Sequence, residues 1–158
     1  MTKMSAYRAM LVILLGLPLL GVRGMSAQSL EDRFAAVKSL TCEFTAMATG
    51  NWTGSEPSAK VRPATLKMAF DQIKLDDGTA RLVGAFGDFD IIVRLSTGNL
   101  HLVQSFKDGP LYVTTLFPRE SRPGKVQAVH TRHEYTLIAM PGYTSRPEQY
   151  YGECALPE

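Results

Sequence analysis

From Thr41 onwards, most of the chain alternates between apolar and polar residues with a period of two, and short turns interrupt the alternation at close intervals. Cys42, Phe44 and Ala46 give the first example, sharing one side of a segment whose other side is polar. A period of two is typical of β-strands, because successive side chains point to opposite faces. Short turns join antiparallel strands, whereas parallel strands need long crossover connections. The pattern therefore predicts an all-β fold of about eight antiparallel strands that follow one another as a meander.

Turn residues divide this alternation into strands of ordinary length. Asp76-Asp-Gly78 is a strong hairpin signal, and Ser96-Thr-Gly-Asn99 separates two further alternating runs. Two longer stretches, residues 50–63 and 118–125, contain Gly and Pro without periodicity, so we expect both to be irregular surface segments. The expected strands are one that starts at Thr41 and others at residues 64–75, 79–83, 89–95, 100–106, 111–117, 126–138 and 149–154.

One short amphipathic helix is expected before the first strand. Ser29-Leu-Glu-Asp32 has the form of a helix-capping pattern. Leu30, Phe34, Val37 and Leu40 follow at helical spacing, which places them on one face. We expect this face to cover an apolar patch of the β-sheet.

The N-terminal segment has an apolar run at residues 10–20, with basic residues on both sides and no acidic residue. This arrangement is typical of a secretory signal peptide. The run is shorter than the roughly 20 apolar residues that a membrane span needs, and Pro18 interrupts it. We therefore predict a signal peptide at residues 1–27, with cleavage before Gln28 or, alternatively, after Gly24. The processed chain is predicted to have no membrane span and to be periplasmic or extracellular.

Cleavage also changes the charge of the chain. It removes Lys3, Arg8 and Arg23, which leaves 14 basic side chains against 15 acidic ones, and these are interspersed along the sequence. A nucleic-acid surface needs clustered basic residues that face the phosphate backbone, so we exclude nucleic acid as a partner. The remaining residues, 28–158, are enough for a single domain with one core.

Two cysteines, Cys42 and Cys154, lie near the two ends of the processed chain. Because export delivers them to an oxidising compartment, we expect a disulfide rather than two free thiols. A disulfide requires α-carbons within about 7 Å, so the first and last strands must lie side by side. The meander then closes into an up-and-down barrel. A barrel of about eight strands is either filled by side chains or holds one small ligand.

The candidate ligand-binding residues are His130, Arg132 and His133, which we place at the barrel mouth, together with Tyr150 and Tyr151 of the closing strand. Residues three apart in a strand face opposite sides, so the two histidines cannot hold one metal ion without a bulge, and we predict no metal site. The two neighbouring tyrosines also face opposite sides of the closing strand. An inward tyrosine can offer its hydroxyl to a ligand or to a buried partner.

No familiar catalytic, dinucleotide-binding or phosphate-binding motif occurs in the sequence, so we predict no cofactor and assign no catalytic residue. The leading hypothesis is a non-catalytic binding protein that holds a small apolar or amphipathic molecule, or an envelope or extracellular partner protein. One alternative is an inhibitor of a periplasmic or secreted protease that acts through residues 50–63. Another is a small enzyme that uses His130 or His133, with Arg132, at the barrel mouth.

Two short segments, Val129-His-Thr-Arg-His133 and Gln149-Tyr-Tyr-Gly-Glu-Cys154, resemble a recurring ending of small exported bacterial β-barrel proteins of unassigned activity. The paired cysteine of those proteins also lies early, in a strand like Thr41-Cys-Glu-Phe44. This resemblance implies an envelope or secreted location and no particular activity. In shape, the predicted barrel is similar to lipocalin-like proteins. The Gly-x-Trp motif of that family is matched only by Gly50-Asn-Trp52, which follows a strand instead of the N-terminal helix.

Overall fold

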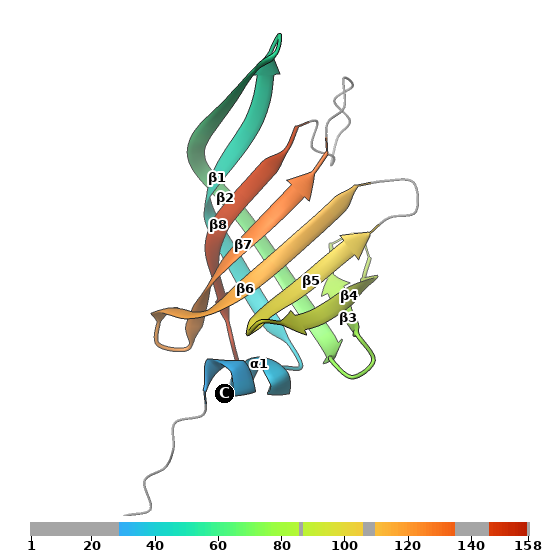
Figure 1. Ribbon diagram of the computed structural model, residues 1–158. Coiled ribbons are helices and arrows are strands. Elements are labelled where there is room, and N and C mark those ends of the chain that lie inside the picture. The colour runs from blue at the N-terminus through green and yellow to red at the C-terminus, as the bar shows by residue number, and fades with distance from the viewer. Residues whose placement is uncertain (1–28, 86, 106–109, 135–145, 158) are drawn as a thin grey trace, which may run out of the picture.

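The computed structural model describes residues 29–85, 87–105, 110–134 and 146–157. Eight antiparallel strands follow one another in chain order around a closed barrel, and the last pairs with the first (Figure 1). This confirms the predicted all-β up-and-down barrel with one short helix. The elements are α1 (Leu30–Ala36), β1 (Leu40–Thr53), β2 (Glu56–Lys74), β3 (Thr79–Val83), β4 (Phe89–Ser96), β5 (Asn99–Ser105), β6 (Leu111–Arg122), β7 (Lys125–His133) and β8 (Glu148–Ala155).

The predicted signal peptide, residues 1–27, lies outside the described residues, and so does the end of the strand predicted at 126–138. Among the residues that the structure describes, no helix is long and apolar enough to cross a membrane.

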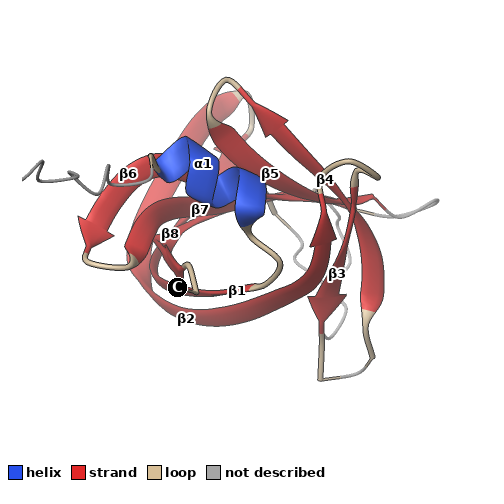
Figure 2. Ribbon diagram, turned by 90° about the horizontal axis from the view of Figure 1, so that it is seen from below, coloured by secondary structure: helices blue, strands red, loops and turns tan. Residues whose placement is uncertain are grey.

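Helix α1 lies across one end of the barrel (Figure 2). Ser29 caps it, because its hydroxyl accepts a hydrogen bond from the backbone N–H of Asp32 at 3.1 Å. Phe34 is fully buried, and Arg33 forms an ion pair with Glu120 of β6 at 3.3 Å. The helix therefore covers this end of the barrel with an apolar side chain.

The apolar core lies inside the barrel and includes Phe34 of α1. Its inward-facing side chains alternate along the strands with more exposed ones, as in β5, where every second residue is buried. The largest fully buried side chains of this core are Phe34, Phe44, Phe70, Ile73, Leu100, Leu102, Leu116, Val93 and Val126.

The disulfide closes the barrel at the seam between β1 and β8. Cys42 lies directly opposite Cys154 in the register of the two strands, and their α-carbons are 4.0 Å apart. This confirms the predicted pairing of the two cysteines. Both cysteines are buried in the core.

The prediction of an irregular loop at residues 50–63 is wrong. β1 and β2 continue through this stretch as a long hairpin that extends beyond the barrel (Figure 1), and Gly54, with φ of +64°, takes part in its turn. β2 pairs with β3 only over residues 69–74, so its earlier part has one edge that pairs with no other described strand. Proline is tolerated in such an edge because no partner strand needs its missing N–H, which explains Pro57 and Pro63.

Residues 118–125 also differ from the prediction. β6 continues to Arg122 and β7 starts at Lys125, so the connection is a tight turn in which Gly124 has φ of +76°. The pairing of β6 with β7 shifts register between Leu116 and Glu120 and again before Arg122. This irregular pairing explains the absence of alternation in the sequence.

Candidate functional site

Inward-facing residues change from apolar to polar towards the end of the barrel opposite α1. Gln104, Thr114 and His130 are polar and at least nine-tenths buried there. Around them, two rows of paired residues cross strands β6, β7, β8, β1 and β2. The first row is Thr114, His130, Tyr150, Met47 and Arg62, and the second is Tyr112, Arg132, Glu148, Thr49 and Lys60.

The polar residues at this end of the barrel are joined by hydrogen bonds, and we call them the mouth cluster. They belong to β6, β7 and β8, except for one that directly follows β7. They are Tyr112, Thr114, His130, Arg132, Glu134, Glu148 and Tyr150. The cluster lies within the barrel because its residues continue the inward-facing alternation of the core.

His130 is the most deeply buried member of the mouth cluster, with 1% of its surface exposed. Its Nδ1 lies 2.9 Å from Oγ1 of Thr114, and Nε of Arg132 donates to its Nε2 at 3.3 Å. Because a guanidinium N–H can only donate, Nε2 is the unprotonated nitrogen and Nδ1–H donates to Thr114. Burial, together with the charge of Arg132, lowers the pKa of His130 to about 3. The imidazole is therefore neutral at physiological pH.

The low pKa of His130 predicts a stability that depends on pH. The unfolded chain binds a proton on this residue below its ordinary pKa of 6.5, whereas the folded chain does so only near 3. The free energy of unfolding should therefore fall as pH drops through this window, with a contribution of up to about 1.4 kcal/mol per pH unit. Urea denaturation of the wild type and His130→Gln at several pH values measures the effect. An unchanged slope in the variant would contradict this account.

Arg132 lies between two tyrosine rings. Its guanidinium carbon is 5.3 Å from the ring centre of Tyr112 and 5.1 Å from that of Tyr150, which are cation–π distances. Its Nη1 is 3.8 Å from Glu148, at the long end of an ion pair. The side chain retains 22% of its exposure, so the positive charge is held in place but still reaches solvent.

Both tyrosine hydroxyls of the mouth cluster donate to carboxylates. Tyr150 donates to Glu148 at 2.6 Å, and Tyr112 donates to Glu134. Burial, followed by the hydrogen bond to Glu148, raises the pKa of Tyr150 to about 12. Each carboxylate of the cluster therefore already has a hydrogen-bond donor from the protein.

The structure brings together three of the five predicted site residues, namely His130, Arg132 and Tyr150. The other two point away from the barrel interior. His133 is exposed on the outer side of β7, and Tyr151 is 43% exposed on β8, where its hydroxyl donates to Gln149 at 2.6 Å. The alternation of side chains along a strand accounts for this division.

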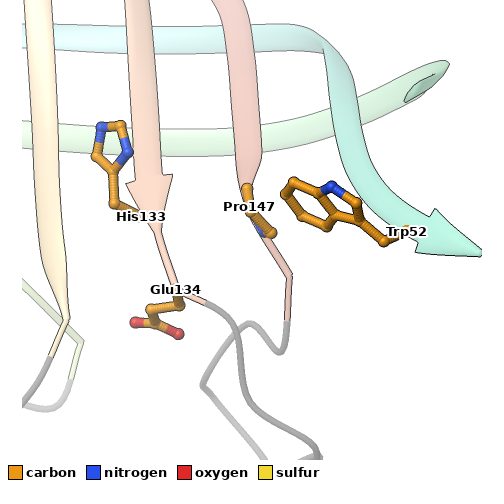
Figure 3. A pocket seen from close by; sticks show the side chains of 4 residues that line it. All are labelled: Trp52, His133, Glu134 and Pro147. Atoms are coloured by element: carbon orange, nitrogen blue, oxygen red, sulfur yellow. The ribbon is translucent and has the colours of Figure 1, made fainter. Parts of the chain in front are cut away.

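An open pocket of about 530 Å³ lies at the rim beside the mouth cluster (Figure 3). Trp52 and Pro147 give it an apolar wall, and His133 and Glu134 add polar groups. Glu134 belongs to both the pocket and the mouth cluster, because it lines the pocket and its carboxylate accepts the hydrogen bond from Tyr112. The volume lies within the range of small-molecule sites, which is about 300–1,000 Å³.

Sequence reasoning missed Tyr112, Thr114 and Glu148, and it did not name Glu134 as a site residue although Glu134 alternates with His130 and Arg132 along the chain. Tyr112 and Thr114 alternate within a strand that was correctly expected, so their common face was predictable. Their position opposite His130 and Arg132 depends on the register of β6 with β7, for which the sequence carries no signal. Glu148 was missed because it precedes the expected closing strand.

Among the described residues, no three His, Cys, Asp or Glu side chains are grouped so that they can hold a metal ion. His130 has both ring nitrogens engaged and a pKa far below neutral, whereas a general acid or base works best with a pKa near the operating pH.

No protein-family model, no curated protein and no solved structure matches this chain.

Proposed function

We propose that this chain is a non-catalytic binding protein that holds a small amphipathic molecule at the end of the barrel opposite α1. One observation carries the proposal. Apolar side chains on the inner face of β2 are only partly buried, and Leu66 among them is paired with Phe44, whose ring centre lies 5.9 Å from that of His130 in the mouth cluster. A molecule with an apolar part and a polar part would contact both surfaces.

The partly buried residues are Ala64, Leu66 and Met68, which alternate along β2. Leu66 is paired with Phe44 of β1, whose side chain is 1% exposed, so the two neighbours differ sharply in burial. The difference arises because β3 does not pair with this part of β2. An apolar ligand lying along β2 would complete the burial of these side chains, at about 25 cal/mol for each Å² removed from water.

Export belongs to the same proposal. The sequence has the features of a signal peptide, and the disulfide between Cys42 and Cys154 suits an oxidising compartment. The closed barrel and the likeness to small exported bacterial proteins support a periplasmic or extracellular binding protein.

A second candidate function, the binding of a partner protein, is favoured by the β1–β2 hairpin. Val61 is 75% exposed and Trp52 is 47% exposed, and this part of β2 has one edge that no other described strand pairs with. Such an edge can pair with an extended segment of another protein. A protease, which binds substrates in this extended form, is one such partner. Deleting residues 52–57 shortens both strands of the hairpin equally. This deletion should remove partner-protein binding and preserve ligand binding, because it leaves Leu66 and the mouth cluster intact.

The neutral fluorescent amphiphile N-phenyl-1-naphthylamine tests the main proposal. Wild-type protein is expected to bind the probe, and Leu66→Gln is expected to weaken binding about tenfold, because a buried leucine contributes about 1.5 kcal/mol or more. Thr65→Gln, on the outer face of the same strand, is the matched control and should bind as the wild type does.

Native mass spectrometry of protein purified from its own host gives an independent test. A small molecule that co-purifies with the wild type and is lost in Leu66→Gln would support the proposal. Repeated recovery of ligand-free protein that also fails to bind the fluorescent probe would overturn it.

A further inference from the structure

We propose that the ligand carries an anionic head group, of which a carboxylate is the simplest form, and that Arg62, Lys60 and Arg132 bind it. This inference rests on the proposed function, because it specifies the ligand of the same site. The observations that carry it are the positions of these three cations and a buried hydroxyl that has no partner.

Two of the cations, Lys60 and Arg62, lie on β2, directly before its partly buried apolar residues. Arg62 is paired with Met47, and its Nε donates to the Met47 sulfur at 3.2 Å, so the guanidinium lies against a residue that is 96% buried inside the barrel. A thioether sulfur is a weak acceptor, and Arg62 is otherwise exposed, so its other N–H groups can donate to a ligand. Lys60 lies two residues away on the same face.

Neither of these β2 cations has a carboxylate partner within the described part of the chain. The ion pairs found there involve Arg33, Lys67, Arg81, Arg122, Lys125 and Arg132, whereas Lys60 and Arg62, like Lys38, Lys74, Arg94 and Arg119, take part in none of them. Lys67, on the outer face of the same strand, does have one, since it pairs with Glu43 at 2.9 Å. The inner face of β2 therefore carries two exposed positive charges that no carboxylate of the described residues neutralises.

The third cation, Arg132, lies on β7, on the other side of β8 and β1 from Arg62 and Lys60. Arg132 and Arg62 are both close enough to Tyr150 to influence its hydroxyl electrostatically, so they share one neighbourhood. The carboxylates of the mouth cluster, Glu134 and Glu148, each already accept a tyrosine hydroxyl. Counting Lys60 with the two arginines, the formal charge of this region is one unit positive.

Thr49 supplies the independent observation. It lies between Glu148 and Lys60 in the second row, and its Oγ1 is buried with no hydrogen-bond partner among the described residues. A buried hydroxyl left without a partner costs about 1–3 kcal/mol. A hydroxyl can donate to an anion, so an anionic oxygen bound beside Lys60 would satisfy Thr49 and the cations together.

The polarity along β2 fixes the orientation of the ligand. Lys60 and Arg62 come first, and Ala64, Leu66 and Met68 follow on the same face towards α1. The six residue-to-residue steps from Arg62 to Met68 span about 20 Å. The anionic group would therefore lie at the outer end, and the apolar part would lie along β2 towards the core.

Calorimetric titration of the purified protein with three probes of one chain length tests the inference: decanoate, 1-decanol and decyltrimethylammonium. The wild type should bind decanoate about tenfold more tightly than either of the others, and added salt should reduce this preference. Arg62→Met should weaken decanoate binding about tenfold and leave decanol binding unchanged. Lys67→Met removes one positive charge from the outer face of the same strand and is the matched control.

Thr49→Val gives a second variant that separates a binding role from a structural one. It should lower the affinity for decanoate several-fold while the melting temperature stays the same or rises, because the substitution removes an unpaired buried hydroxyl. Equal binding of decanoate and decanol, or decanoate binding that Arg62→Met leaves unchanged, would overturn the anionic head group and leave the proposed function standing. Failure of the wild type to bind any of the three probes would overturn both.

Discussion

Replacing Cys42 and Cys154 together by alanine is expected to lower the free energy of unfolding by about 4 to 5 kcal/mol. The disulfide joins residues 112 positions apart, and closing so long a loop removes much of the conformational freedom of the unfolded chain. In the folded state it joins β1 directly to β8, the seam that turns the meander into a closed barrel. Urea denaturation of the double variant and the wild type gives the difference.

The same seam holds part of the candidate site, since Met47 of β1 lies opposite Tyr150 of β8. Reduction of the wild-type disulfide should therefore reproduce the loss of stability and weaken binding of the fluorescent probe. A double variant within about 1 kcal/mol of the wild type would contradict the role assigned to the disulfide.

Gly152→Ala is expected to destabilise the barrel by more than about 3 kcal/mol. A β-carbon at this position would lie 2.0 Å from the carbonyl oxygen of Glu43 and 2.6 Å from the α-carbon of Phe44. Both are backbone atoms of β1, at the point where its register with β8 shifts, so relief requires the strand itself to move.

Gly50→Ala is the matched control for Gly152→Ala, because its added β-carbon would come no closer than 3.7 Å to any atom of Pro147. We expect this control to stay within about 1 kcal/mol of the wild type. Thermal and urea denaturation compare the three proteins. Similar stabilities for the two variants would show that the close approach of β1 to Gly152 is not a constraint on the fold.

Most of the architecture followed from the sequence, because alternation and turn chemistry are local signals. The pattern of residues 64–83 predicted a strand, a turn at Asp76-Asp-Gly78 and a returning strand, and the structure has β2, a turn in which Gly78 adopts φ of +71°, and β3. Closure of the barrel followed from Cys42 and Cys154, because a disulfide restricts where the two ends of the chain can lie.

The long β1–β2 hairpin could not be predicted in the same way. Its tip extends beyond the core, and residues 56–63 of β2 are all exposed, so this stretch needs no apolar alternation. Pro57 and Pro63 are ordinarily signals against a strand, and they fit here only because β3 leaves that edge unpaired.

For the candidate site, the sequence predicted which residues share a face but not which strands meet. His130 and Arg132 were correctly placed together by the alternation, whereas Arg62 and Thr49 come from segments far away in the sequence. Their approach depends on the registers of β1 with both of its neighbours. Register is a tertiary property, set by packing across the whole barrel.

The central claim is that an amphipathic molecule binds along the inner face of β2 at the end of the barrel opposite α1. Methyl NMR of protein labelled at its methionines tests this most directly, because Met47 lies beside Arg62 and Met68 lies further along the same inner face. Met47→Leu and Met68→Leu assign the two signals. On titration with decanoate, both signals should shift together and saturate with the same dissociation constant. Binding of decanoate that leaves both methyl signals unmoved would contradict the claim.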